Sequence, residues 1–205
     1  KLVTRPPKTD KPVDPEFVEL REKWLNNLLG GTLDTGNQAV VTYITGLDEK
    51  AGEYWSSMIK SDDASRTNLW SDLDMSYIAG TGAKAKVHSG NVAQTFYRLK
   101  DMAIAWATEG CALYQNDELK EELIRALDFM NENHYSSSDD KTPFFGNWWH
   151  WEIGGPIAFM DTALILYDDL TLKQITNYAA AVNRFTNVCD KPSGYPGSPA
   201  MTGAN

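Results

Sequence analysis

Residues 91–109, NVAQTFYRLKDMAIAWATE, place apolar side chains three or four positions apart along the chain. The apolar positions are Val92, Phe96, Leu99, Met102 and Trp106. This spacing follows the 3.6-residue period of an α-helix that buries one face. We therefore expect a helix from about Asn91 to Glu109, with its apolar face in a hydrophobic core.

The segments on either side of this helix show the same period. Their apolar spacing and turn residues predict helices over 14–30, 37–60, 116–130, 151–167 or 156–167, and 171–185. No segment shows the two-residue alternation of a half-buried strand. The loops between the helices differ in length, and hairpins with uneven loops occur in helical toroids. The sequence therefore predicts an all-α fold, an incomplete (α/α) toroid of antiparallel helix hairpins.

Several helix ends carry their own signals. Asp14 is followed by Pro15, the combination of a capping side chain and a proline at the first helical position. Asn116 precedes two acidic residues, which suit the N-terminal end of a helix dipole. Thr171 and Gln174 have the spacing of a capping box. These signals indicate helices that start at 15, 117 and 172.

The two ends of the chain lack such patterns. Residues 1–13, KLVTRPPKTDKPV, read as an extended leader or linker. The chain reaches Asn205 within a stretch rich in glycine and proline, without a closing helix. We interpret residues 14–205 as an incomplete domain.

Composition narrows the classes of partner. The net charge of −9 and the isoelectric point near 4.8 argue against nucleic acid, because binding phosphate requires a basic surface. No apolar run approaches the length of a membrane span, so no membrane partner is expected. Cys111 and Cys189 fit neither a disulfide framework nor a metal cluster, and we expect two buried thiols, although one disulfide is the alternative. No metal or other cofactor is predicted.

Residues 144–156, FFGNWWHWEIGGP, hold three tryptophans within four positions, flanked by glycines. Trp148 and Trp149 are adjacent, so a helix or strand would point them in different directions, whereas a loop could present both to a ligand. Aromatic planes pack against the C–H faces of sugars, and an amide such as Asn147 can bind sugar hydroxyls. The alternative is a structural role, in which this segment fastens the helices together.

The stretch from Asn147 to Gly154, NWWHWEIG, resembles the NWWxxEIG signature of polysaccharide lyase family eight. That family contains hyaluronate, chondroitin AC and xanthan lyases. Residues 202–205, TGAN, resemble a second family segment at a similar distance downstream. Weaker similarity covers 66–70, 97–99 and 164–168, so that the resemblance extends over nearly all of the chain after Asp14. It implies that residues 14–205 are the N-terminal portion of the α/α-toroid catalytic domain, with the rest of that domain absent from this chain.

The resemblance implies roles for matching positions only. Trp148 and Trp149 would form the aromatic patch that seats the sugar chain, and Asn147 would hydrogen-bond it. His150 would line the cleft wall, and Trp151 is a further candidate substrate-binding residue. Asn205 would be the catalytic amide that binds the uronate carboxylate. The family's histidine base, tyrosine acid and substrate-binding arginine lie beyond the TGAN segment. Residues 1–205 alone are therefore expected to be inactive and to need the remainder of the lyase polypeptide as a partner.

The leading hypothesis is a secreted lyase that cleaves an acidic polysaccharide by β-elimination beside a glucuronate. His150 followed by Trp151 resembles xanthan lyases more than hyaluronate or chondroitin AC lyases, which remain the alternative. Glu152 and Asp161 offer a different hypothesis, because paired carboxylates serve inverting glycoside hydrolases on helical toroids. The third hypothesis is a non-catalytic carbohydrate-binding module that uses the tryptophans. Secretion is an expectation from the substrate class.

Overall fold

The computed structural model describes residues 11, 14–63, 65–138 and 142–186 of the chain. Within these residues the backbone forms α-helices and one π-helical turn, and no strand occurs. In chain order the elements are α1 (Pro15–Leu29), α2 (Gln38–Ser57), α3 (Ala83–Ala107), α4 (Asp117–Asn133), the π-helical turn η1 (His150–Gly154), α5 (Gly155–Ile165) and α6 (Leu172–Thr186). The predicted all-α class is therefore confirmed.

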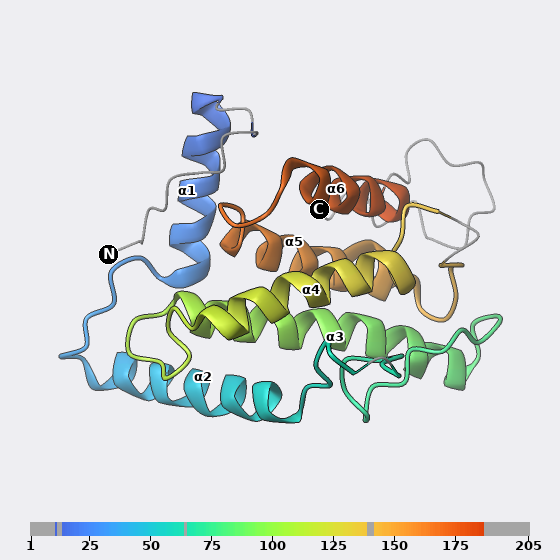
Figure 1. Cartoon of the computed structure of the whole chain (residues 1–205), viewed down its shortest axis with the longest axis horizontal. Coiled ribbons are helices and arrows are strands. Elements are labelled where there is room, and N and C mark those ends of the chain that lie inside the picture. Colours follow the sequence, from blue (N-terminus) through green and yellow to red (C-terminus); the bar gives the residue numbers. More distant parts are fainter. Residues whose placement is uncertain (1–10, 12–13, 64, 139–141, 187–205) are drawn as a thin grey trace.

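From α2 onward the helices alternate in direction, so that α2, α4 and α6 run one way and α3 and α5 run the other (Figure 1). The central helix α3 packs along α5, and α2 and α4 lie against it (Figure 1). Antiparallel neighbours of this kind are helix hairpins. The described helices form part of an α/α toroid, as the sequence predicted.

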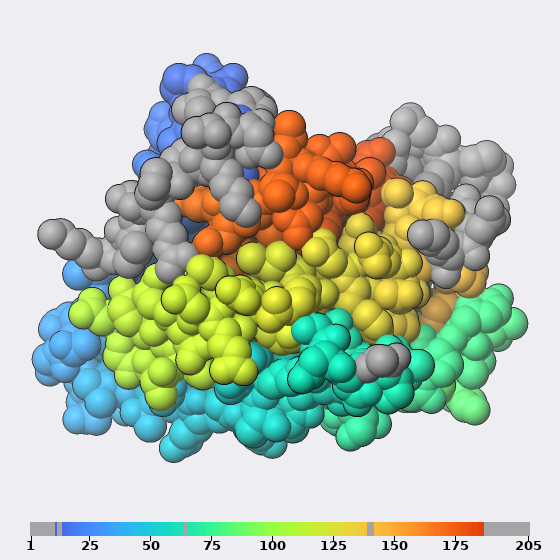
Figure 2. Space-filling view, viewed as in Figure 1, coloured from blue at the N-terminus to red at the C-terminus, as the bar shows by residue number. Residues whose placement is uncertain are grey.

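The face shown in Figure 2 is formed largely by α4, which lies between α2 and α6. Its opposite side enters the core through Leu119, Leu123, Leu127 and Met130, all fully buried. These positions recur every three or four residues, as expected for an amphipathic helix. The other charged residues of α4 lie on the remaining surface of the helix, except Glu122, which is buried and pairs with Arg66 at 2.8 Å.

The predicted N-terminal caps are present. Asp14 Oδ1 accepts the backbone N–H of Glu16 at 2.9 Å, and Pro15 is the first residue of α1. Asn116 Oδ1 accepts the backbone N–H of Leu119 at 2.8 Å. Each cap satisfies a backbone donor that has no partner within the first helical turn.

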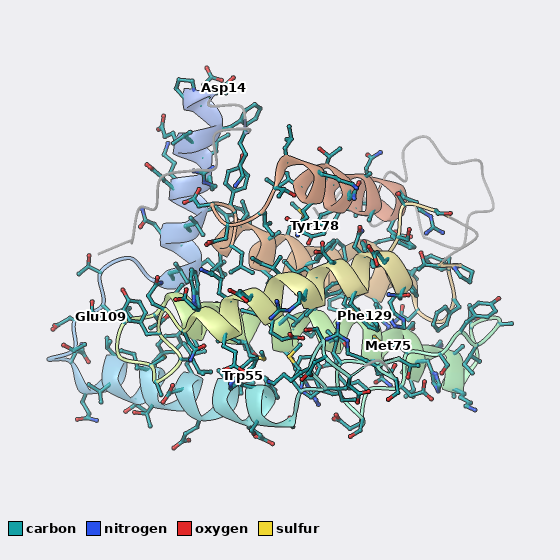
Figure 3. All side chains as sticks on the ribbon, viewed as in Figure 1. Asp14, Trp55, Met75, Glu109, Phe129 and Tyr178 are labelled. Carbon is teal, nitrogen blue, oxygen red and sulfur yellow. The ribbon has the colours of Figure 1, made fainter. Side chains whose placement is uncertain are left out.

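The predicted capping box at the start of α6 is also present. The Gln174 side chain accepts the Thr171 backbone N–H at 2.8 Å, and Thr171 Oγ1 accepts the Gln174 backbone N–H at 3.3 Å. From the same helix, Tyr178 Oη donates to Asp128 Oδ1 of α4 at 2.6 Å, and Figure 3 shows Tyr178 on the side of α6 toward α4. Burial and this hydrogen bond raise the pKa of Tyr178. The pair therefore joins α6 to α4 in a fixed register.

One predicted helix start is wrong, and the structure decides between two alternatives for another. Helix α3 begins at Ala83 instead of Asn91, and its cap, Gly82, has no side chain that could have signalled the start. Helix α5 begins at Gly155, one residue before the predicted start at Pro156, whereas the alternative start at Trp151 lies within η1. The apolar pattern of 151–167 does not reveal this local widening of the helix.

The core next to η1 is aromatic. Trp151 stacks between Tyr135 and Phe185, with ring centroids 6.1 Å and 5.0 Å away. Its indole N–H donates to the carbonyl of Phe145 at 2.6 Å. Tyr135 Oη donates to the carbonyl of Trp151 at 2.7 Å. Both polar groups are therefore satisfied in the interior, which removes the cost of burying them. Cys111 is likewise buried and carries a free thiol, whereas Cys189 lies outside the described residues.

Helix α1 packs less fully than the others. None of its residues is buried, and Phe17 is 70% exposed, with Leu20 and Trp24 more than half exposed. Its main polar contact is the Trp24 indole N–H, which donates to Asp161 Oδ1 of α5 at 2.9 Å. Helix α1 therefore presents an apolar face, Phe17, Leu20 and Trp24, that the described helices leave uncovered.

Candidate functional site

The segment predicted to carry the site packs along the N-terminal half of α3. The Gly146 backbone N–H donates to the carbonyl of Gly80 at 2.8 Å. Asn147 Oδ1 then accepts the backbone N–H of Trp149 at 3.2 Å, which caps the helical turn that begins at Trp148. This turn continues through η1 into α5. The expectation of an open loop is wrong at Trp148 and Trp149, because both belong to a helical turn.

Glycines make this close packing possible. Gly146 has a φ of 71°, in the left-handed region that favours glycine. A Cβ atom at Gly146 would clash with Ser89 Oγ and the Ala85 carbonyl. A Cβ atom at Gly154 would clash with the Trp149 ring and the Tyr97 hydroxyl. The glycines therefore let the segment lie directly on α3 and seat the Trp149 ring.

Ser89 of α3 joins the two ends of the segment 147–150. Its buried hydroxyl accepts the Asn147 backbone N–H at 3.1 Å and lies 3.0 Å from His150 Nδ1. The imidazole ring of His150 lies over Gly90, where a Cβ atom would be 3.2 Å from Cε1. Burial lowers the pKa of His150 below its usual range, so the ring is neutral at neutral pH. The segment is thus held by specific bonds from a regular helix.

The tryptophans of the segment have different environments. Trp149 is 38% exposed, and its ring lies against Gly154 and the half-buried Tyr97. Burial raises the pKa of the Tyr97 hydroxyl, so Tyr97 is a neutral neighbour. Trp148 is half-buried. Asn147 and His150 are also half-buried, so the structure brings together Asn147, Trp148, Trp149 and His150 at one exposed edge of α3. We call these four residues the aromatic segment.

Trp151 belongs to the core and not to this surface. It is 1% exposed and enclosed by aromatic rings, so it cannot offer a face to a sugar. The prediction that Trp151 contacts substrate is therefore corrected. The turn that brings Trp149 outward carries Trp151 inward, because residues two apart on a helix point in different directions.

The paired carboxylates of the hydrolase hypothesis do not form an open site. Glu152 and Asp161 are both buried. Asp161 accepts the Trp24 indole N–H and lies 3.7 Å from Lys100 Nζ, so it connects α1, α3 and α5. A hydrolytic pair must reach a glycosidic bond and a water molecule. The burial of both groups argues against the inverting hydrolase.

Three further points concern the catalytic amide, metal binding and membrane-spanning helices. Asn205, the predicted catalytic amide, lies outside the described residues, so its role stays a prediction. The described part of the chain contains no group of three or more His, Cys, Asp or Glu side chains that could hold a metal ion. None of the described helices has the length and apolarity to cross a membrane.

Sequence reasoning missed Ser89 and Gly90, which lie between the predicted helices 37–60 and 91–109, where no helix was expected. It also gave no role to Tyr97, although 97–99 was part of the weaker resemblance. A serine followed by a glycine does not by itself predict a contact with a distant segment. The helical contact between α3 and the aromatic segment is long-range, and a single sequence carries no local signal for it.

Comparison with known proteins identifies the family. Residues 24–205 match the family model described as polysaccharide lyase family 8, N terminal alpha-helical domain. The chain belongs to this family. It is 36% identical to a xanthan lyase of Bacillus sp. (strain GL1) over 172 residues, which are 83% of this chain and 17% of that protein. It is 32% identical to the hyaluronate lyase HylB of Enterococcus faecalis over 185 residues, 87% of this chain and 17% of that protein.

A solved structure agrees with this assignment. The structure of Paenibacillus xanthan lyase superimposes with a TM-score of 0.74 and 34% sequence identity, over 89% of this chain and 16% of that one. The chain therefore spans about a sixth of the length of each of these three relatives. The activity of the whole protein is accordingly a proposal.

The fit of Gly146 against α3 can be tested by adding one methyl group. We expect Gly146→Ala to lower the free energy of unfolding by about 2–4 kcal/mol, because it combines an unfavourable φ with overpacking against Ser89. The matched control is Gly52→Ala in α2, where nothing lies within 4 Å of an added Cβ atom. That change should raise the free energy of unfolding by about 0.5–1 kcal/mol. Urea unfolding measures both, and equal effects at the two positions would contradict the proposed contact.

Proposed function

We propose that this chain is the N-terminal part of the catalytic domain of a lyase that cleaves an acidic polysaccharide by β-elimination beside a glucuronate. The observation that carries the proposal is the aromatic segment. Its exposed Trp149 ring and its Asn147 amide lie together within the NWWHWEIG sequence, on a chain that belongs to polysaccharide lyase family 8. A flat ring beside an amide suits a sugar, which has apolar C–H faces and polar edges.

The chemistry of the proposal concerns the proton on C5 of the uronate. This proton is weakly acidic, and its removal places negative charge on the neighbouring carboxylate. A fixed amide donor at Asn205 would stabilise that charge, as an oxyanion hole does. A base takes the proton and an acid protonates the departing oxygen at C4, which leaves a C4–C5 double bond. We expect the base, the acid and the binding arginine beyond residue 205, in the remainder of the polypeptide.

The substrate we favour is xanthan, with hyaluronan or chondroitin as the alternative. Two observations support xanthan. His150 followed by Trp151 resembles the xanthan-type form of the signature, and the Bacillus xanthan lyase is more similar in sequence than the Enterococcus hyaluronate lyase. All three polymers contain a uronate beside the scissile bond, so one elimination mechanism serves each.

The double bond allows a direct test. The intact protein that contains this domain is incubated separately with xanthan, hyaluronan and chondroitin, and the near-ultraviolet absorbance of the unsaturated uronate is followed. We expect a rise with xanthan. Asn205→Ala should reduce kcat roughly 100- to 1000-fold, as expected for loss of an oxyanion donor. The control Asn133→Ala, at an exposed position of α4, should retain activity. New reducing ends without absorbance would contradict the lyase and favour a hydrolase.

The role of the aromatic segment can be tested separately by binding. In an Asn205→Ala background, which keeps the polymer intact, Trp149→Ala should raise the Kd roughly two- to tenfold, as expected for one lost aromatic contact. The control Tyr43→Ala removes an exposed ring from α2 and should leave the Kd unchanged. A fluorescence titration measures both. Unchanged affinity in Trp149→Ala would reject the aromatic segment as a sugar surface, for a lyase and for a binding module alike.

We also propose that the remainder of the polypeptide covers the apolar face of α1 and that the protein acts outside the cell, where such polymers occur. The exposed Phe17, Leu20 and Trp24 support the first part, because contiguous exposed apolar side chains mark contact surfaces.

Hydrogen exchange tests this contact. Backbone amides of α1 should exchange roughly tenfold or more slowly in the intact protein than in the chain of residues 1–205, because covering a helix suppresses its local opening. Backbone amides in the centre of α3, which is already packed on several sides, serve as the internal control and should exchange at similar rates in both proteins. Equal exchange of α1 in both proteins would show that the face stays uncovered.

A further inference from the structure

The hydroxyl of Ser89 has three polar neighbours. It donates to the Lys86 carbonyl at 3.1 Å, accepts the Asn147 backbone N–H at 3.1 Å, and lies 3.0 Å from His150 Nδ1. Ser89 is fully buried, within a regular part of α3. A single side chain of α3 therefore contacts both the first and the last residue of the aromatic segment.

The hydrogen-bonding capacity of the Ser89 hydroxyl favours one tautomer of the His150 ring. A serine hydroxyl has one proton to donate and two lone pairs that accept. The proton goes to the Lys86 carbonyl, and the Asn147 N–H uses one lone pair. The remaining lone pair can then accept from Nδ1–H of the neutral His150 ring, which is the tautomer that this arrangement favours. Nε2 is then unprotonated and is a hydrogen-bond acceptor.

The Asn147 side chain has the complementary capacity. Its Oδ1 accepts the Trp149 backbone N–H, which fixes the orientation of the amide. The NH₂ group makes no hydrogen bond with the described part of the chain and is a donor. The aromatic segment thus offers one hydrogen-bond donor, the Asn147 NH₂ group, and one acceptor, His150 Nε2. In the sequence, Asn147 precedes Trp149 and His150 follows it.

We propose that Ser89 is a positioning residue for substrate binding: it fixes the Asn147 backbone and the Nδ1–H tautomer of His150, so that Asn147 donates to the sugar and His150 Nε2 accepts from a sugar hydroxyl. This inference rests on the proposed function and deepens it. Ser89 is buried and does not touch the sugar in this proposal, yet it contributes to the affinity for the polysaccharide. This role also explains why Gly146 and Gly90 adjoin Ser89, since larger residues would displace the two groups that its hydroxyl orients.

The first test compares Ser89→Ala with Thr162→Val in the intact protein. Both changes remove a fully buried hydroxyl, but Thr162 Oγ1 bonds only the Ala158 carbonyl of its own helix among the described residues. With the polymer that the wild type cleaves, Ser89→Ala should raise KM roughly three- to tenfold and change kcat less than roughly twofold, as expected for weakened ground-state binding. Thr162→Val should keep the wild-type KM. Equal KM values for the two variants overturn the proposal.

The second test addresses the tautomer and stays valid if Ser89→Ala does not fold. The amide of a glutamine occupies roughly the place of Nε2, and that of an asparagine the place of Nδ1. His150→Gln can supply an acceptor to the sugar, so its KM should stay within roughly twofold of the wild type, whereas His150→Asn should raise KM roughly three- to tenfold. Equal KM values, or the reverse order, overturn the assignment of Nε2 as acceptor.

Failure of the proposed function has a different result. A wild-type protein that neither binds nor cleaves xanthan, hyaluronan or chondroitin overturns the lyase proposal and this inference together. A wild type that produces unsaturated uronate, with Ser89→Ala and His150→Asn both at the wild-type KM, overturns the inference alone.

Discussion

The close contact between residues 146–155 and the N-terminal half of α3 determines where every other part of the site lies. It requires glycine at 146 and 154, where a Cβ atom would clash with groups of α3 or with Trp149. Ser89 adds directional bonds to this steric fit. Since α3 is the central helix and packs on several sides, the segment takes on the rigidity of the core.

This contact also places Trp149 and Trp151 in different environments. Trp149 remains partly exposed above Gly154, whereas Trp151 turns inward and stacks between Tyr135 and Phe185. The π-helical turn η1, which follows Trp149 and contains Trp151, widens the helix, and such turns are frequent at functional sites. Burying Trp151 anchors the turn, so that Trp149 is presented at a fixed angle. A short sequence thereby contains both the proposed sugar-binding surface and the core residue that orients it.

The sequence predicted the all-α fold and most helix ends, because caps and apolar periods are local signals. Asp14, Asn116 and Thr171 with Gln174 all form the expected bonds. It could not predict the start of α3, since Gly82 supplies no capping side chain. For the site, it found the aromatic segment through its residue types and family resemblance. It placed Trp151 wrongly and missed Ser89, because burial and contacts between distant segments depend on the whole fold.

The most direct measurement is a structure of the intact protein, as the Asn205→Ala variant, with a bound oligosaccharide of the polymer it cleaves. We expect a sugar ring stacked on Trp149, with the Asn147 NH₂ group and His150 Nε2 within hydrogen-bond distance of its polar groups. Trp151 should remain enclosed in the core. An oligosaccharide bound elsewhere, with the Trp149 face empty, would contradict the assignment of this segment as the sugar-binding surface.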